Sequence, residues 1–269
     1  MKGKKFFTVI LVVLLLCSVC GCGSKKDDEQ LTGDHLERII QRGSIIVAME
    51  GTWAPWTYHN ESDELVGYDV EVAKCIAEKL GVEVEFVEGE WDGLLAGLDD
   101  GRYDIMVNGV GVTEEREQKY DFSTPYAYNR TAVIVRGDYN DIKSMEDLKG
   151  KTTANTISST YAMQAESYGA EVTAVDDLTQ TIELLLAERI DATLNAEVVF
   201  TDYKKAHPES DIKIAAYSDD VEKVAIPVQK GEDSASLLEA INKALDELSA
   251  DGTLTELSEK YFGMDISKE

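Results

Sequence analysis

The segment RYDIMVNGVGVTEEREQKYDFSTPYAY, residues 102–128, combines an apolar run, a glycine-containing loop and a single arginine just beyond it. Its residues 103–107 form an apolar run with the composition of a buried strand. The run ends in Asn108, Gly109, Val110 and Gly111, and glycine allows another group to approach the backbone closely. We therefore predict a strand whose carboxyl end opens into a ligand-binding loop made of these four residues.

An arginine follows this loop within one turn of a predicted helix. Thr113 is a suitable cap for that helix, and acidic residues occupy its first turn. Arg116 would then lie beside the glycines, where a guanidinium can bind a carboxylate through two parallel hydrogen bonds. The pattern leaves open a surface arginine that pairs with the neighbouring glutamates.

Short β-rich runs alternate with helical runs on both sides of this segment. Alternation of this kind predicts a mainly parallel sheet covered by helices, with ligands at the carboxyl ends of the strands. The number of runs fits two α/β lobes of about 100 residues each better than one wide sheet. The expected strands are 44–49, 83–87, 103–107, 132–136, 152–155, 171–175, 192–194 and 224–228. The expected helices are 68–80, 91–98, 144–148, 160–168, 178–187, 198–206, 234–249 and 254–261.

Hydroxyl side chains follow the strand predicted at residues 152–155. Ser158, Ser159 and Thr160 precede or begin a helix, where free N–H groups favour an anion. Simple helix capping by Ser159 or Thr160 is the alternative. One half-site for a carboxylate would thus lie in each lobe.

Three tryptophans follow the ends of neighbouring predicted strands. Trp53 and Trp56 come after strand 44–49, and Trp91 comes after strand 83–87. Trp53 and Trp91 could enclose the aliphatic part of a ligand, whereas core packing is an open alternative for Trp56. Metal-ligand spacings, phosphate-binding motifs and nucleophile motifs are not found, so we expect no cofactor, no metal and no catalytic residue.

The N-terminus has the layout of a secretory signal, with a basic start and an apolar run at residues 6–16. We expect residues 1–21 to be removed, Cys22 to carry lipid such as palmitate, and residues 22–42 to form a flexible linker. A plain signal peptide is the alternative. Cys75 would then be the remaining free thiol, so no disulfide can form. A lipid anchor without disulfides favours a Gram-positive cell surface.

The charge excludes one class of partner. The formal net charge is −26, and loss of the three lysines of residues 1–21 makes it −29. An acidic chain of this kind has little to offer nucleic acid. We expect contact with the membrane through the lipid alone.

Several motifs together resemble the family 3 solute-binding proteins of bacterial ABC importers. They are GYDVEVAKCIAEKLG, WDGLLAGLDDGRYDIMVNGVGVTEEREQKYDFSTPY, DLKGKTTANTISSTY, DATLNAEV and INKALDELSADGTLTELSEKYFG. The motifs WDGLLAGLD and KYDFSTPY are most similar to the cystine-binding branch. The resemblance implies an α/β, two-lobed periplasmic-binding-protein fold of type II, with parallel-rich sheets and two crossover hinge segments. The large lobe would comprise residues 43–128 and 224–264, and the small lobe residues 129–223.

The resemblance also implies roles for individual residues. Arg116 would bind the α-carboxylate of a ligand, and Ser159 would complete this contact with the backbones of Ser158 and Thr160 beside it. The carbonyl of Gly109 would receive the α-ammonium. The rings of Trp53 and Trp91 match the positions that flank the ligand side chain, and Glu50 matches an acidic position near its polar end.

Two positions depart from the family pattern. Gly111 stands where many members have serine or threonine, and Ala196, after Asn195, stands where most have an ammonium-binding aspartate. A buried ammonium without an anion is costly. Either Glu50 or Glu197 takes over this role, or the ligand is not an ordinary α-amino acid.

The resulting prediction is a monomeric, lipid-anchored binding protein that is not an enzyme. It would capture a small amino acid, cystine-like or otherwise polar, and deliver it to an ABC permease and its ATPase. Two alternatives stay open: an enzyme similar to cyclohexadienyl dehydratase on the same fold, and a ligand sensor that acts on a signalling partner.

Overall fold

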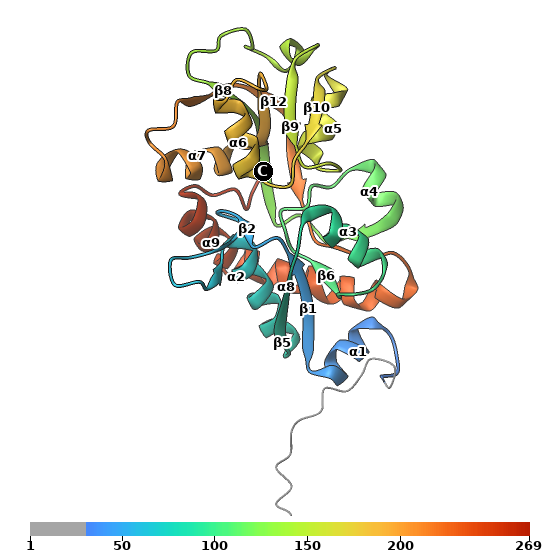
Figure 1. The fold of residues 1–269 in the computed structure, drawn as a ribbon. Coiled ribbons are helices and arrows are strands. Elements are labelled where there is room, and N and C mark those ends of the chain that lie inside the picture. The colour runs from blue at the N-terminus through green and yellow to red at the C-terminus, as the bar shows by residue number, and fades with distance from the viewer. Residues whose placement is uncertain (1–30) are drawn as a thin grey trace, which may run out of the picture.

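The chain folds into two α/β lobes, one above the other, in a computed structural model that describes residues 31–269 (Figure 1). The predicted signal segment and Cys22 lie outside these residues. Within the described part of the chain, no helix is both long and apolar enough to span a bilayer.

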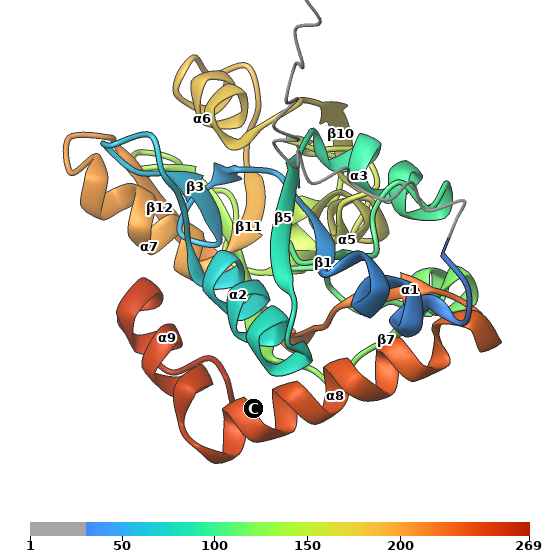
Figure 2. The ribbon, with the colours of Figure 1, turned by 90° about the horizontal axis from the view of Figure 1, so that it is seen from below.

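The lower lobe in Figure 1 is built around a parallel three-stranded sheet. Strand β1 (Ser44–Met49) lies between β5 (Glu83–Glu88) and β6 (Ile105–Met106). Most side chains of β1 are buried, because helices cover the sheet. Figure 2 shows the long helix α8 running along one side of this lobe, next to α2. The helices of the lobe are α1 (His35–Arg42), α2 (Tyr68–Leu80), α3 (Trp91–Asp99), α4 (Glu114–Lys119), η3 (Glu232–Ser234), α8 (Ala235–Ala250) and α9 (Thr253–Phe262).

Two small antiparallel sheets complete this lobe. One pairs β7 with β13, and the other is a meander that follows β1. Their strands are β7 (Tyr120–Phe122), β13 (Pro227–Gln229), β2 (Thr52–Trp53), β3 (Thr57–His59) and β4 (Leu65–Val66).

The upper lobe contains an antiparallel sheet in the order β11-β8-β12 and a parallel pair, β9 and β10. A parallel bridge between Thr153 and Ala192 brings these two sheets together. The strands are β8 (Ala127–Arg136), β9 (Thr152–Asn155), β10 (Glu171–Ala174), β11 (Thr193–Ala196) and β12 (Ile212–Val224). The helices are η2 (Met145–Leu148), α5 (Thr160–Ser167), α6 (Leu178–Leu186) and α7 (Glu197–Ala206).

Strands β8 and β12 cross between the lobes as an antiparallel pair. Their ladder runs from Ala127 opposite Val224 to Arg136 opposite Ile212, with two irregularities. Gly111 forms an isolated bridge with Val224, which ties the loop after β6 to this crossing. The lobe boundaries that we propose at residues 128 and 224 fall at the start of β8 and the end of β12.

Three predictions of secondary structure were wrong in detail. Residues 224–228 do not form one strand: β12 ends at Val224 and β13 begins at Pro227. The strand expected from residue 132 begins at Ala127, because β8 forms the crossing. Residues 35–42, expected in a linker, form helix α1, which Asp34 caps by a reciprocal bond with Glu37.

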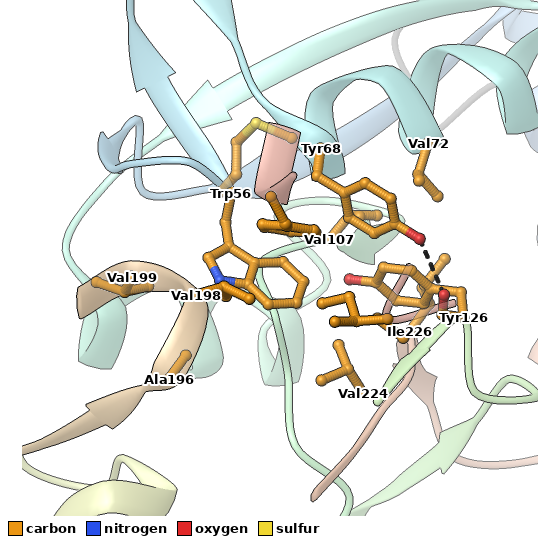
Figure 3. Close-up of a cluster of buried hydrophobic side chains, with 14 of the residues drawn as sticks. Trp56, Tyr68, Val72, Val107, Tyr126, Ala196, Val198, Val199, Val224 and Ile226 are labelled. Atoms are coloured by element: carbon orange, nitrogen blue, oxygen red, sulfur yellow. Dashed lines mark hydrogen bonds between the residues drawn. The ribbon is translucent and has the colours of Figure 1, made fainter. Parts of the chain in front are cut away.

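The main hydrophobic core extends from one lobe through the crossing into the other. Figure 3 shows Trp56 and Val107 of the lower lobe in one cluster with Val224 and Val198. The Tyr68 hydroxyl donates to the carbonyl of Tyr126 (2.9 Å), the residue before β8. The lobes are therefore packed against each other at the crossing.

Candidate functional site

A cavity of about 60 Å³ lies between the lobes. Its walls come from loops at the carboxyl ends of strands in both lobes, as expected for ligand sites in α/β sheets. The lower lobe contributes Glu50, Thr52, Trp53, Trp91 and Gly109. The upper lobe contributes Asn155, Thr156, Ser159, Thr160, Tyr161, Asp177, Leu178, Thr181 and Asn195.

Gly109 lines the cavity, and contacts with Trp53 and Asp69 fix its position. Its φ is +56°, and a Cβ atom there would lie 2.5 Å from a ring carbon of Trp53. Its amide donates to the buried Asp69 carboxylate (2.6 Å), which also accepts from the Tyr126 hydroxyl (2.8 Å). Burial raises the pKa of Asp69 to about 7. The loop after β6 is thus fixed to the start of the crossing.

Arg116 is buried and reaches across the cleft. Its guanidinium donates to the carbonyl of Gly111 (2.7 Å) and to the carbonyl of Ser158 in the other lobe (2.8 Å). It also lies 5.1 Å from the ring centroid of Trp91. Burial lowers the pKa of Arg116, but an arginine in a protein stays charged. Its burial is incompatible with the alternative of a surface arginine that pairs with neighbouring glutamates.

The start of α5 faces the cavity. The Ser159 hydroxyl accepts from the amide of Ala162 (3.1 Å), so this residue caps the helix and also lines the cavity. Ser158, with a φ of +59°, turns its hydroxyl to Asp92 of the lower lobe. Arg116 therefore lies next to a helix start whose first amides have no acceptor within the helix.

Glu50 lines the cavity directly after β1. One carboxylate oxygen accepts from the side-chain amide of Asn108 (2.7 Å), and the Glu50 amide donates to the side-chain oxygen of Asn108 (2.8 Å). Burial, together with the nearby charges of Asp177 and Asp92, raises the pKa of Glu50 to about 7, although the hydrogen bond from Asn108 opposes the shift. Asn108 is fully buried and holds this carboxylate in place.

The two predicted ring positions line the cavity, but Trp56 does not. Trp56 is fully buried and stacks beneath Trp53 with ring centroids 5.5 Å apart. Trp56 therefore supports the wall without forming it. Val110 is also fully buried, in the core around Trp91.

Glu197 points away from the cavity. Its carboxylate accepts from Arg130 (3.0 Å) and from the Tyr217 hydroxyl (3.0 Å), and it is not among the lining residues. Asn195 lines the cavity, and its side-chain oxygen accepts from the amide of Ala196 (2.8 Å). Of the two candidates for the missing aspartate, the structure brings only Glu50 to the cavity.

We expect Glu197→Gln to leave ligand affinity within about twofold of wild type, because the carboxylate pairs outside the cavity and exposed pairs contribute little. Calorimetric titration with the tightest-binding amino acid measures this. A loss of tenfold or more would place Glu197 at the ligand.

Gly111 has a structural reason to be glycine. A Cβ atom at this position would lie 2.0 Å from a carboxylate oxygen of Glu222 on β12. Burial raises the pKa of Glu222, and the nearby Arg116 opposes this shift. The space of the family hydroxyl is therefore filled by a carboxylate from the crossing strand.

Sequence reasoning missed Asp177 and Asn155. Asp177 precedes α6 and caps it, so its local pattern is that of an ordinary helix start. Asn155 ends β9, where a single polar residue gives no signal. Among residues 31–269, no three His, Cys, Asp or Glu side chains are grouped as a metal would require.

The half-buried Glu50 makes stability depend on pH. Its pKa rises from the ordinary 4.5 to about 7 on folding, so its contribution is full below pH 4.5 and is lost as the pH rises through 7. Glutamine mimics the protonated form. The unfolding free energy of ligand-free Glu50→Gln minus that of wild type should therefore increase by about 2 kcal/mol from pH 5 to pH 8, because only wild type loses the contribution of Glu50.

Urea unfolding of both proteins at pH 5 and at pH 8 measures these unfolding free energies. The exposed Glu61→Gln serves as the control and should follow wild type. A difference between Glu50→Gln and wild type that stays constant with pH would show that Glu50 does not titrate in this range.

Comparison with known proteins places the chain in a family. The sequence model of the bacterial extracellular solute-binding proteins, family 3, matches residues 45–264. The chain belongs to this family. The L-cystine-binding protein TcyA of Bacillus subtilis is 38% identical over 98% of the chain and all of that protein. These relatives are binding proteins, and this family 3 protein is accordingly not an enzyme.

Two solved structures differ in how well they superpose on this family 3 protein. The L-cystine solute receptor of Neisseria gonorrhoeae, in an unliganded open conformation, is 41% identical, with a TM-score of 0.60 over 88% of the chain and all of the receptor. An ancestral arginine-binding protein bound to arginine is 37% identical, with a TM-score of 0.76 over 82% and 99%. The higher TM-score thus belongs to the structure with the lower sequence identity.

Proposed function

We propose that this protein is the amino-acid-binding component of an ABC importer, anchored by lipid at Cys22, and that it delivers its ligand to a membrane permease. Support comes from the family, from relatives named for cystine and arginine binding, and from the buried Arg116. Its guanidinium bonds across the lobes to the carbonyl of Ser158, the residue before Ser159 of the cavity wall. Arg116 is the observation that carries the proposal, because a buried guanidinium beside a helix start favours a carboxylate ligand.

The proposed ligand carboxylate binds between Arg116 and the start of α5. Arg116 has five N–H donors and uses two for the carbonyls of Gly111 and Ser158, so donors remain for a carboxylate. Ser159 and Thr160 lie in the cavity wall of the upper lobe, where the Ser159 hydroxyl and the amides of both residues can donate. The rings of Trp53 and Trp91 would flank the side chain.

Contacts between the lobes explain how binding would close the cleft. Arg116 to the Ser158 carbonyl and Ser158 to Asp92 are bonds between lobes, and an open cleft would break both. A ligand that contacts both walls adds interactions found only in the closed state, and so shifts the population toward it. The permease would then receive the closed, loaded form.

Mass spectrometry of small molecules released by denaturing the natively purified protein tests this function. We expect an α-amino acid, and calorimetry should show that it rebinds to the stripped protein. The proposal would be refuted if amino acids neither co-purify nor bind, or if the protein turns over prephenate. The mass of the mature N-terminal peptide tests lipidation at Cys22.

A further inference from the structure

Two carboxylates from opposite lobes line the cavity, and no lysine, arginine or histidine is among its lining residues. One oxygen of Glu50 binds Asn108, and one oxygen of Asp177 caps the Gln180 amide (2.8 Å). The second oxygen of each has no hydrogen-bond partner within residues 31–269. Each wall thus offers an acceptor that the protein itself leaves free.

Asn155 supplies an independent observation at the same cavity. This side chain is 4% exposed, and its oxygen has no hydrogen-bond partner in the described part of the chain. Its amide nitrogen donates to the carbonyl of Leu194 (2.7 Å), which fixes the orientation of the amide group. Buried polar atoms are normally paired, so a free acceptor in a cavity wall calls for a donor from a ligand.

The charges that surround Glu50 differ from those that surround Arg116. Asp177 and Asp92 are the neighbouring charges that raise the pKa of Glu50, whereas Glu222 is the main charge near Arg116. The carboxylates of Glu50 and Asp177 repel each other when the cleft closes without a ligand. A cation between them removes this repulsion and pairs with both.

We propose that Glu50, Asp177 and Asn155 form a subsite for a cationic nitrogen of the ligand, an ammonium or a guanidinium, which bridges the two lobes. This assignment rests on the proposed function as an amino-acid-binding protein. It makes Asp177 a specificity residue in a cavity where Ala196 replaces the family aspartate. A carboxylate without a cationic nitrogen beside it, as in the side chain of L-glutamate, is repelled at this end of the ligand by the charge of the wall.

Asp177→Asn is a clean test, because asparagine also caps helices and the variant should keep α6 intact. Asp176→Asn is the matched control: it makes the same charge change one residue earlier, at an exposed side chain that does not line the cavity. Both variants and wild type are titrated with L-cystine, L-lysine, L-glutamine and L-glutamate, and their melting temperatures are compared.

We expect L-glutamate to bind most weakly to wild type. Asp177→Asn should weaken the tightest probe at least tenfold, with Asp176→Asn within twofold of wild type. If L-glutamine is weakened as well, the α-ammonium occupies the subsite. If only L-lysine or L-cystine is weakened, the second cationic group occupies it.

The subsite is overturned if both variants bind every probe equally well, or if L-glutamate is the tightest ligand. Failure of the proposed function looks different, since wild type would then bind no amino acid of any kind, and the subsite would fall with it.

Discussion

Arg116→Ala is expected to lower amino-acid affinity by about 30- to 5,000-fold. The guanidinium is buried, and removing one partner of a buried charged pair costs about 2–5 kcal/mol or more. The same change removes the bond to the Ser158 carbonyl and so weakens the closed state. Calorimetric titration of the stripped protein with its tightest-binding amino acid measures the loss.

A matched control and a conservative variant sharpen this test. Arg102→Ala removes an exposed arginine whose nearest carboxylate, Asp100, is 3.7 Å away, and should leave affinity unchanged. Arg116→Lys keeps the charge but loses the planar pair of donors, so its affinity should fall between those of wild type and Arg116→Ala. If Arg116→Ala bound the ligand with wild-type affinity, the Arg116 guanidinium would not be part of the binding site.

Gly109→Ala is expected to lower affinity by about 30- to 100-fold. The residue has a φ of +56°, and a Cβ atom would lie 2.5 Å from the Trp53 ring. A strained backbone of this kind costs about 1–3 kcal/mol, and relief of the clash would move the ring out of the cavity wall. Calorimetry gives the affinity, and tryptophan fluorescence on ligand addition reports on the ring.

Gly93→Ala is the control for this substitution. Nothing lies within 4 Å of a Cβ atom at position 93, which is an exposed helical position. Alanine there should increase the unfolding free energy by about 0.5–1 kcal/mol and leave affinity unchanged. Equal ligand affinity of the Gly109→Ala and Gly93→Ala variants would show that the Trp53 ring does not depend on Gly109.

Much of the fold could be predicted because local patterns and tertiary structure agree. The apolar run before Asn108 is a buried strand end, and β9 occupies the residues predicted for it. The crossing strand β12 was harder, because its sequence IKIAAYSDDVEKV contains acidic residues and its ladder is irregular. Its pairing with β8 stabilises it, and a local pattern does not report such pairing.

Local sequence patterns also fail to report the long-range contacts of the site. Arg116 is surrounded in sequence by glutamates, and only the position of the upper lobe shows that its partner is Ser158. Asp177 looks like a helix cap in the sequence, and only the fold places it in one cavity with Glu50. Long-range contacts between the lobes decide both cases.

The most direct test is a crystal structure of the protein with its tightest-binding amino acid. We predict the ligand carboxylate within hydrogen-bond distance of both the Arg116 guanidinium and the hydroxyl or amide of Ser159, with the lobes closed. A ligand whose carboxylate contacts neither residue, or one bound outside the cavity between the lobes, would contradict the account.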